Sequence, residues 1–562
     1  MQRNGCCSFA TIALLRDVGS RVGLAQRTPA FNRHRLQIRH MPTSPTLLET
    51  VPADQKIRRS VWKFAVSAIV VGLLATGIWF RIVELDHVPG LNGDEAWSGV
   101  QAVNFLQGKE VAWRTPTGNP LNVFFIGPLV LLHAVMPPSI ALLRSVSVAS
   151  GLLALGANFW LCRRVFDRTT AVVSTVLLAV LPVMIAYSRF AWDSSQTPLA
   201  SVLVVYLALA IAKRPRGAGW NWLWLLLAIA AAVWVHPTNV FLLPLVVACV
   251  TPWEKLRIAG PRLIVFIALI AAVTFFVRST TDLGRFTLDL TRLFSGATIY
   301  RFISGGVQSD AFGWCDVIAW CLVAFAVYGL IKRIENADDL LDLRLAVGVL
   351  LSLAVFFVVA GPRGVQPHLE RYAIWTIVPI SLAVSRGVSW WLRPEFRYRS
   401  VALAAGVSVA VGLLFGFERL YFQVFDTTGG DSHLAFRTAD IDPKQRALQH
   451  ILNHRRTDRT SLIVSESWWT YWPLAYLASA SDNVRVADGR KFDANPSDFD
   501  GSDLWFVELV GSEGEQMARR RIARTGKEFT SVSVNDRGNN PTILVIQASA
   551  RRSPLRESDS PL

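Results

Sequence analysis

The stretch VWKFAVSAIVVGLLATGIWF at residues 61–80 decides the fold class of this chain. It contains one charged residue, Lys63, and is long enough for a membrane-spanning helix, which needs about 20 mostly apolar residues. Comparable apolar runs recur down to about residue 420 and alternate with short basic segments. This pattern predicts a polytopic α-helical membrane protein.

The composition agrees with this class. Of the 562 residues, 52% are hydrophobic and 17% are charged, and the mean hydropathy is +0.36. The net charge of +16 lies largely in the N-terminal tail and in short loops between the apolar runs. Loops of this kind are typical of the cytoplasmic side of membrane proteins, so we expect membrane lipids but no nucleic acid as partners. The six cysteines are scattered and predict neither a disulfide framework nor a metal site.

The apolar runs predict eleven spans. Residues 222–250 are too long for one span and are broken at His236-Pro237, so they count as two short helices. Residues 121–135 are too short and contain Pro128, which favours an interfacial or re-entrant helix that does not count. The other nine predicted spans are 61–80, 141–161, 171–187, 199–212, 263–277, 314–331, 343–360, 372–392 and 401–421.

The basic loops predict the orientation. With the N-terminus in the cytoplasm, the clusters near residues 163–168, 213–216, 255–262, 332–333 and 393–399 all fall on the cytoplasmic side. Counting 121–135 as a span, or 222–250 as only one, would move several clusters outside. Making both changes would leave the later loops on the same sides as before. The basic loops therefore constrain whether the number of spans is odd or even more than they constrain the number itself.

The chain divides into four predicted regions. We expect a disordered basic tail at 1–58, a transmembrane region at 59–424, a soluble extracytoplasmic domain at 425–550 and a disordered tail at 551–562. In the soluble part, segments whose apolar residues have helical spacing alternate with segments whose apolar residues have strand spacing. This pattern predicts a small α/β domain. Its predicted helices are 444–454, 469–477 and 516–525, and its predicted strands are 461–465, 484–487, 504–509, 530–534 and 543–547.

Two adjacent carboxylates, Asp94 and Glu95, follow the first span in GLNGDEAW at residues 90–97. Acidic side chains at a membrane surface usually face a cavity, a pathway or a partner, so a functional site is the default hypothesis. The alternative is a solvated loop with two ordinary acids. A carboxylate here can accept the proton of an attacking hydroxyl group.

Further polar residues fall on the same predicted side. Guanidinium groups bind phosphate through a bidentate fork, so arginines beside these acids would suit a lipid phosphate. The simpler alternatives are that Asp193 caps a helix, that Arg371 anchors a span end, and that His236 is a turn residue. The candidates on this side are Arg189, Asp193, His236, Arg363 and Arg371.

Several motifs carry a family resemblance over roughly residues 60–420. The acidic loop is followed by a short amphipathic segment at 96–107 and by LLRSVSVASGLL at 142–153. YSRFAWD at 187–193 resembles a second acidic outer loop, and ERYAIWTIVP at 370–379 resembles a segment that opens a late span. Together they resemble the type C (GT-C) membrane glycosyltransferases, in particular the protein O-mannosyltransferases and the aminoarabinose transferase that modifies lipid A.

The resemblance implies an inverting transfer of a hexosyl or pentosyl group. The donor would be a polyprenyl-phosphate or polyprenyl-diphosphate sugar, and the acceptor a hydroxyl group of a protein, lipid or glycan outside the cytoplasmic membrane. Asp94 would be the general base, Glu95 would orient the acceptor, contact the sugar or help to hold a cation, and Asp193 would assist acceptor or metal binding. Arg371 and Tyr372, with Arg363 or Arg189, would bind the leaving phosphate.

Two details of the resemblance stay open. The aminoarabinose transferase has a lysine before proline that holds phosphate, whereas this chain has Gly118-Asn119-Pro120 and leaves Arg114 as a substitute. The acidic pair is compatible with Mg²⁺ or Mn²⁺ but requires neither, so no cofactor is assigned.

Two other classes of protein are alternatives. A secondary transporter would show internal repeats and charges at the membrane midplane, and neither is visible in the sequence. A membrane scaffold with an extracytoplasmic binding domain would tolerate alanine at Asp94, whereas a transferase would lose activity.

Overall fold

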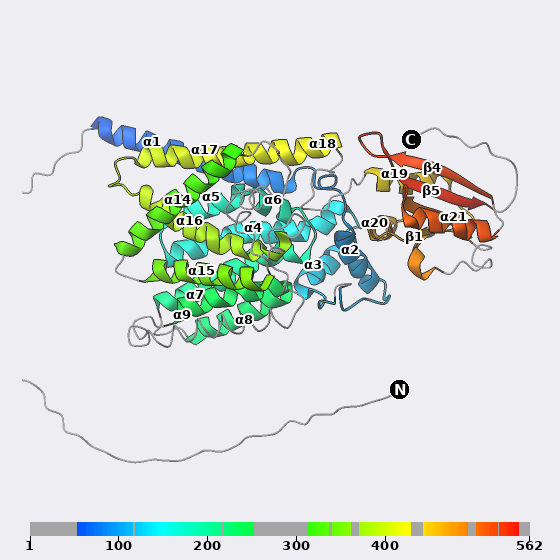
Figure 1. The fold of residues 1–562 in the computed structure, drawn as a ribbon, viewed down its shortest axis with the longest axis horizontal. Helices are drawn as coiled ribbons and strands as arrows, with labels where there is room; N and C mark the ends of the chain where they lie inside the picture. The colour runs from blue at the N-terminus through cyan, green and yellow to red at the C-terminus, as the bar shows by residue number, and fades with distance from the viewer. Residues whose placement is uncertain are drawn as a thin grey trace, which may run out of the picture. The chain divides into compact units, whose positions relative to one another are not determined.

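The computed structural model describes residues 53–115, 118–214, 219–251, 313–336, 340–360, 370–428, 442–492, 502–525 and 528–549. Residues 62–562 belong to one compact unit, which contains every described helix and strand apart from the start of α1. Within it, a largely helical region is followed along the chain by a small α/β domain (Figure 1). The predicted fold class is therefore confirmed, whereas the predicted region boundaries stay predictions.

Five apolar segments of the described chain are long enough to cross a membrane. Helices α5 (Arg168–Val180) and α6 (Pro182–Ser188) make a sixth if the bent pair is one span. The predicted number of eleven stays a prediction, and the predicted span 263–277 lies outside the described residues. The five helices are α1 (Ala53–Ile82), α4 (Ile140–Val165), α7 (Thr197–Lys213) with the preceding η1 (Asp193–Gln196), α15 (Leu341–Ala360), and α17 (Arg399–Phe417) continuing through η7 (Glu418–Gln423) and α18 (Val424–Thr428).

Shorter elements complete the helical region. The predicted break in residues 222–250 is confirmed, because α8 (Gly219–Val235) ends before His236, and η2 (Pro237–Leu242) and α9 (Leu243–Val250) follow it. The predicted interfacial segment forms α3 (Val123–His133), whose 11 residues span about 17 Å, far less than a bilayer core of about 30 Å. The others are α2 (Gly93–Leu106), α14 (Gly313–Glu335), η5 (Glu370–Tyr372), η6 (Ile374–Thr376) and α16 (Ile377–Trp391).

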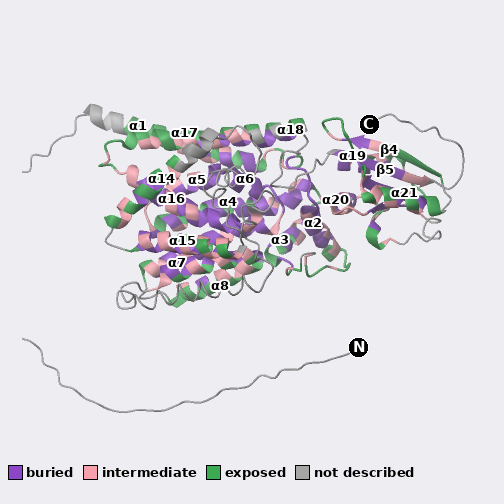
Figure 2. Cartoon of the chain, in the orientation of Figure 1, coloured by how far each residue is buried: buried purple, intermediate pink, exposed green. Residues whose placement is uncertain are grey.

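Helices α1, α8 and α17 have many exposed residues (Figure 2), and several of these are large and apolar. Phe64 of α1 is 77% exposed, Trp220 of α8 is 76% exposed and Val401 of α17 is 65% exposed. A protein dissolved in water rarely exposes contiguous apolar patches of this kind, whereas a lipid bilayer covers them at no cost. The exposed surfaces of these helices therefore fit contact with lipid.

The predicted span 171–187 is not one straight helix. Helices α5 and α6 meet at an angle of 64° at Pro182. Because proline has no backbone N–H, it leaves the carbonyl of Leu178 without its partner in the helix. The guanidinium group of Arg81 donates to the carbonyl oxygens of Leu178 and Ala179, at 3.1 and 2.8 Å. An arginine from α1 thus satisfies the backbone at the bend.

The C-terminal domain is built on a five-stranded sheet in the order β2-β1-β3-β5-β4. Strands β2, β1 and β3 are parallel, and β5 and β4 are antiparallel to their neighbours. Apolar side chains cover both faces, with Trp505 in one core cluster and Phe506 in the other. All eight predicted elements are confirmed: β1 (Thr460–Ser465), β2 (Val484–Asp488), β3 (Ser502–Leu509), β4 (Glu528–Asn535), β5 (Pro541–Ser549), α19 (Asp442–His454), α20 (Trp468–Ala478) and α21 (Glu513–Thr525).

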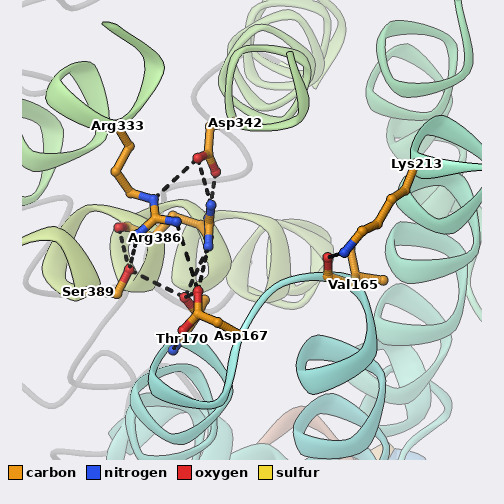
Figure 3. Close-up of polar contacts among 8 residues, drawn as sticks. All are labelled: Val165, Asp167, Thr170, Lys213, Arg333, Asp342, Arg386 and Ser389. Atoms are coloured by element: carbon orange, nitrogen blue, oxygen red, sulfur yellow. Dashed lines mark hydrogen bonds and ion pairs between the residues drawn. The ribbon is translucent and has the colours of Figure 1, made fainter. Parts of the chain in front are cut away.

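A charge network joins four helices of the helical region (Figure 3); Arg386 and Asp342 are buried, whereas Asp167 is 43% exposed. Arg386 donates to both carboxylate oxygens of Asp342, at 2.5 and 2.6 Å, and to Asp167 at 2.9 Å. Arg333 donates to Asp342 at 3.2 Å. We call these four residues the inner clasp, because they lie at the helix ends predicted to face the cytoplasm. The clasp ties the beginning of α5 to α14, α15 and α16.

Candidate functional site

Glu95 and Asp94 have different surroundings although they are adjacent. Glu95 is fully buried at the start of α2. One carboxylate oxygen accepts from Arg144 Nε at 3.0 Å and from the N–H of Ala191 at 2.7 Å; the other accepts from Arg144 Nη2 at 2.9 Å and from the N–H of Asn92 at 3.1 Å. This corrects the expectation that Glu95 contacts a sugar, an acceptor or a cation, because both oxygens are already saturated and inaccessible.

Asp94 occupies the accessible position. Its side chain is 29% exposed, and its Oδ1 accepts a hydrogen bond of 3.0 Å from the indole of Trp468. Its Oδ2 lies 3.9 Å from Nη1 of Arg371. The structure therefore brings together the first acidic loop, the segment before α16 and the C-terminal domain.

Arg371 is surrounded by aromatic and acidic residues. Its guanidinium carbon lies 4.6 Å from the centre of the Trp192 ring and 4.9 Å from that of Tyr372, whose hydroxyl accepts a bond of 3.1 Å from Nη2. Arg371 also interacts electrostatically with Asp193 and His236. We call the set Asp94, Trp192, Asp193, His236, Arg371 and Tyr372 the outer cluster.

Asp193 and His236 both lie at helix starts, but only His236 caps its helix: Asp193 is the first residue of η1, which has no side-chain cap bond. Oδ1 of Asp193 accepts the N–H of the next residue, Ser194, at 2.7 Å, which is a local bond and not a helix cap. His236 precedes η2 and contacts Thr238, its Nδ1 lying 2.7 Å from the hydroxyl. Burial, assisted by the positive charge of Arg371, lowers the pKa of His236 to about 4. The imidazole is therefore neutral at pH 7 and adds no charge to the cluster.

Two of the other predicted phosphate-binding arginines, Arg189 and Arg114, are not assembled with Arg371. Arg189 is fully buried, and its terminal nitrogens donate to the backbone carbonyls of Phe80, Glu84 and Val88. This corrects the expectation for Arg189, since its guanidinium group holds the turn after α1 rather than a ligand. Arg114 is exposed and donates to the carbonyl of Gly118, and Arg363 lies outside the described residues.

The C-terminal domain contacts α2 through α20. A Cβ atom on Gly93 would lie 2.5 Å from Trp468, and one on Gly99 would lie 2.5 Å from Tyr476, so only glycine permits this approach at both positions. The Tyr476 hydroxyl donates to the carbonyl of Ser139 at 2.9 Å and lies 2.9 Å from Nε2 of His133. The two regions are therefore held by close packing and by hydrogen bonds.

Sequence reasoning missed two residues of this arrangement. Arg144 lies in the motif at 142–153 but was given no role, although the Asn92-x-x-Glu95 spacing is the signature of a capping box that buries the glutamate at the helix start. Trp468 lies in the aromatic run ESWWTYW at 466–472, directly after β1. Nothing in that run indicates that its first tryptophan reaches Asp94.

A protein-bound metal ion does not fit these residues. Within the described part of the chain, no group of three or more His, Cys, Asp or Glu side chains is placed to hold a metal. Glu95 is saturated, and Asp94 already receives one neutral donor and faces a guanidinium group. We therefore derive no step through a metal.

Comparison with known proteins identifies the fold. Residues 122–277 match the family model described as dolichyl-phosphate-mannose-protein mannosyltransferase. The chain resembles ArnT from Cupriavidus metallidurans bound to undecaprenyl phosphate, with a TM-score of 0.51 and 14% identity over 87% of this chain and 98% of that one. The apo oligosaccharyltransferase of Archaeoglobus fulgidus is less similar, with a TM-score of 0.43 and 14% identity over 84% of this chain and 70% of that one.

A search of curated sequences found no match. The family-model match and the similarity to ArnT agree with the resemblance drawn from the motifs. The chain is therefore a multi-pass membrane protein with the fold of the type C glycosyltransferases.

Proposed function

We propose that this protein transfers a sugar from a polyprenyl-phosphate or polyprenyl-diphosphate donor to an acceptor hydroxyl group, with inversion at the anomeric carbon. The reaction takes place at the outer face of the cytoplasmic membrane. ArnT of Cupriavidus metallidurans, which has the same fold, binds undecaprenyl phosphate. The acceptor is a protein, a lipid or a glycan.

The observation that carries this proposal is the loose pair formed by Asp94 and Arg371. The two charged groups are 3.9 Å apart, and their side chains are 29% and 15% exposed. A partly exposed pair at this distance lacks a direct hydrogen bond and contributes little to folding, about 1 kcal/mol or less. A lipid phosphate that accepts a bidentate bond from Arg371 therefore displaces little stabilising energy.

The outer cluster supplies the groups that the reaction needs. Asp94 accepts the proton of the acceptor hydroxyl, whose oxygen bonds to the anomeric carbon from the face opposite the phosphate. The bond between that carbon and the phosphate oxygen breaks, and the lipid phosphate leaves with the electron pair. Arg371, held against Trp192 and Tyr372, neutralises its negative charge.

The other acids have supporting roles. Glu95 fixes the beginning of α2 through Arg144 and so determines where Asp94 points. Asp193 lies near Arg371 and is suited to bind an acceptor hydroxyl. His236 lies beside Tyr372, with the ring centres 6.1 Å apart, and contributes a neutral side chain to the outer cluster.

The location follows from the predicted orientation, in which the N-terminus is cytoplasmic. Asp94 and the C-terminal domain are on the same side, because Trp468 bonds to Asp94 and Lys444 donates to the carbonyl of Leu91. Helix α4 runs from Arg144, beside Glu95, to the residues before Asp167 of the inner clasp. Its 26 residues span about 39 Å, enough to cross the bilayer core.

The test uses undecaprenyl phosphate, because a polyprenyl-phosphate donor releases this lipid whatever sugar it carries. The full-length protein in detergent is titrated with the lipid, and binding is measured as an increase in thermal stability. Arg371→Gln should weaken binding by about 10- to 100-fold, since a hydrogen bond to a charged group contributes about 1.5–3 kcal/mol. Arg485→Gln, the matched control at an exposed arginine of the C-terminal domain, should bind like the wild type.

Two results would overturn the proposal. Equal binding by the wild type and Arg371→Gln would exclude Arg371 from the phosphate site. Once a consumed donor is found among undecaprenyl-phosphate sugars, Asp94→Asn should reduce its turnover by about 10²- to 10⁴-fold, the usual contribution of a general base. Full turnover by this variant would exclude Asp94 as the base.

A further inference from the structure

Trp468 reaches the outer cluster from the C-terminal domain, 374 positions along the chain from Asp94. Its indole Nε1 donates to Asp94 Oδ1 at 3.0 Å, while Asp94 Oδ2 faces Arg371. We propose that Trp468 is a positioning residue of the C-terminal domain, which fixes the rotamer of the Asp94 carboxylate and stabilises its ionised form. This inference rests on the proposed function only in assigning a use to that carboxylate.

The surrounding residues restrict where the indole lies. Trp468 is the first residue of α20, and the Ser467 hydroxyl caps this helix by accepting the N–H of Trp469 at 3.2 Å. The preceding residue is also tied down, because Glu508 on β3 accepts the N–H of Glu466 at 2.7 Å. On the other side, Gly93 leaves no space between α2 and the indole. The loop after β1 therefore presents the indole in a defined position.

The two carboxylate oxygens of Asp94 have different partners. An indole is a neutral group with one N–H and no acceptor, so it can only donate to the carboxylate. A donor to an ionised carboxylate favours the charged form, which is the form a general base needs. Because the donor holds Oδ1, rotation of the carboxylate would break a hydrogen bond. Oδ2 therefore stays on the side of Arg371.

The contact also makes the catalytic face depend on the C-terminal domain. Tyr476 and Lys444 fasten the domain to the loops around α2, and Trp468 delivers its contribution directly to the reacting carboxylate. Docking and positioning are thus carried by different side chains. They can be separated by substitution.

The test follows the protonation of Asp94 itself and needs no substrate. The full-length protein is treated with a water-soluble carbodiimide and an amine at a series of pH values, and labelling of the Asp94 peptide is measured by mass spectrometry. In Trp468→Phe, the midpoint pH of Asp94 labelling should rise by roughly half a unit to one unit, because one hydrogen bond to the carboxylate is lost. An unchanged midpoint in a folded Trp468→Phe protein would overturn the inference.

Two controls separate this effect from general damage. Trp472→Phe removes an indole N–H from the same helix, and that N–H has no hydrogen-bond partner among the described residues. Tyr476→Phe removes the hydroxyl that contacts Ser139 and His133, weakening the docking without changing the indole. Both should keep the wild-type midpoint. A rise in Tyr476→Phe equal to that in Trp468→Phe would mean that only docking matters.

A second measurement needs no variant of Trp468 and covers the case in which Trp468→Phe does not fold. In protein with ¹⁵N-labelled indoles, one indole N–H resonance should shift with the same midpoint pH as Asp94 labelling, and this shift should disappear in Asp94→Asn. The absence of such a resonance would overturn the inference. Failure of the proposed function is distinguishable, because it appears in lipid-phosphate binding and turnover rather than in either titration.

Discussion

The inner clasp and the outer cluster use the same residue types for different purposes. In the clasp, Asp342 accepts three hydrogen bonds of 2.5 to 3.2 Å, and Arg386 and Asp342 are 7% and 2% exposed. In the outer cluster, Asp94 and Arg371 are 3.9 Å apart and 29% and 15% exposed, which matches the peripheral Arg333–Asp167 pair of the clasp but not its buried centre. The buried Arg386–Asp342 pair holds helices together, whereas the Asp94–Arg371 pair is the one that we propose receives a ligand. Packing rather than residue type therefore separates the two roles.

Asp94 and Glu95 repeat this contrast within a single turn of α2. Glu95 accepts four hydrogen bonds and is fully buried, while Asp94 is partly exposed. The difference arises because Glu95 is the third residue of a capped helix and turns back toward Asn92, where Arg144 meets it. If substitution of Asp94 destabilised the protein more than substitution of Glu95, this explanation would be wrong.

The largest effect on stability is expected at the clasp. Arg386→Met removes the bidentate partner of the buried Asp342 and leaves it with Arg333 alone, so we expect a loss of about 3 kcal/mol in the free energy of unfolding. Thermal or denaturant unfolding of the full-length protein in detergent measures it. Arg371→Met is the matched control. Equal losses in the two variants would remove the distinction between clasp and cluster.

The next largest effect is expected at Glu95. Glu95→Gln keeps the shape of the side chain but leaves the buried Arg144 without its counter-charge, so we expect a loss of about 2–4 kcal/mol. The same unfolding measurement applies. A variant that is as stable as the wild type but cannot turn over donor would instead restore a direct chemical role for Glu95.

A pH-dependent effect is expected in the C-terminal domain. Burial raises the pKa of Glu508 to about 7, and the negative charge of Glu466 adds to the rise. Between the unfolded value near 4.5 and about 7, the folded protein holds a proton that the unfolded chain has lost. This group therefore makes the protein less stable as pH rises through that window, and its effect is constant above it.

Glu508→Gln removes this dependence. The free energy of unfolding of the variant minus that of the wild type should be about 1–3 kcal/mol larger at pH 8 than at pH 4.5. Unfolding of both proteins at the two pH values measures this difference. Glu513→Gln on α21, a glutamate at the surface of the same domain, serves as the control. A variant that loses stability at pH 8 would show that the ionised carboxylate, and not its neutral form, stabilises the loop before Trp468.

The smallest effect on stability is expected at the outer cluster. Asp94→Asn and Arg371→Gln should each change the free energy of unfolding by less than about 1 kcal/mol, because the pair is long and partly exposed. Their effects on lipid-phosphate binding and turnover should be far greater. A loss of stability comparable to that of Arg386→Met would make this pair structural, and the contrast would fail.

The elements of this fold follow from local patterns in the sequence. Apolar runs identify the helices at 61–80, 141–161 and 343–360, and His236-Pro237 identifies the break before η2. The bend at Pro182 could also have been predicted, because proline inside a helix removes a backbone hydrogen bond. Periodicity was equally informative in the soluble domain, where each strand contributes to a buried face.

The site was less predictable because its residues take their roles from tertiary contacts. The proximity of Asp94 and Arg371 was expected from the predicted topology, because both residues lie between predicted spans on the outer side of the membrane. The burial of Arg189 depends on carbonyl groups exposed at the turn after α1, which no local pattern indicates. Trp468 belongs to another domain, so its contact with Asp94 is invisible to any local signal.

The separation of Trp468 and Asp94 has a consequence for biosynthesis. At about 5–20 residues per second, the ribosome needs roughly 20 to 75 seconds to synthesise the 374 residues that follow Asp94. The nascent chain therefore inserts its acidic loop long before the indole exists. A product that terminated early would retain the acidic pair and many of the apolar helices, with Gly93 and Gly99 uncovered. The hydrogen bond between Trp468 and Asp94 can therefore form only after the ribosome has reached the C-terminal domain.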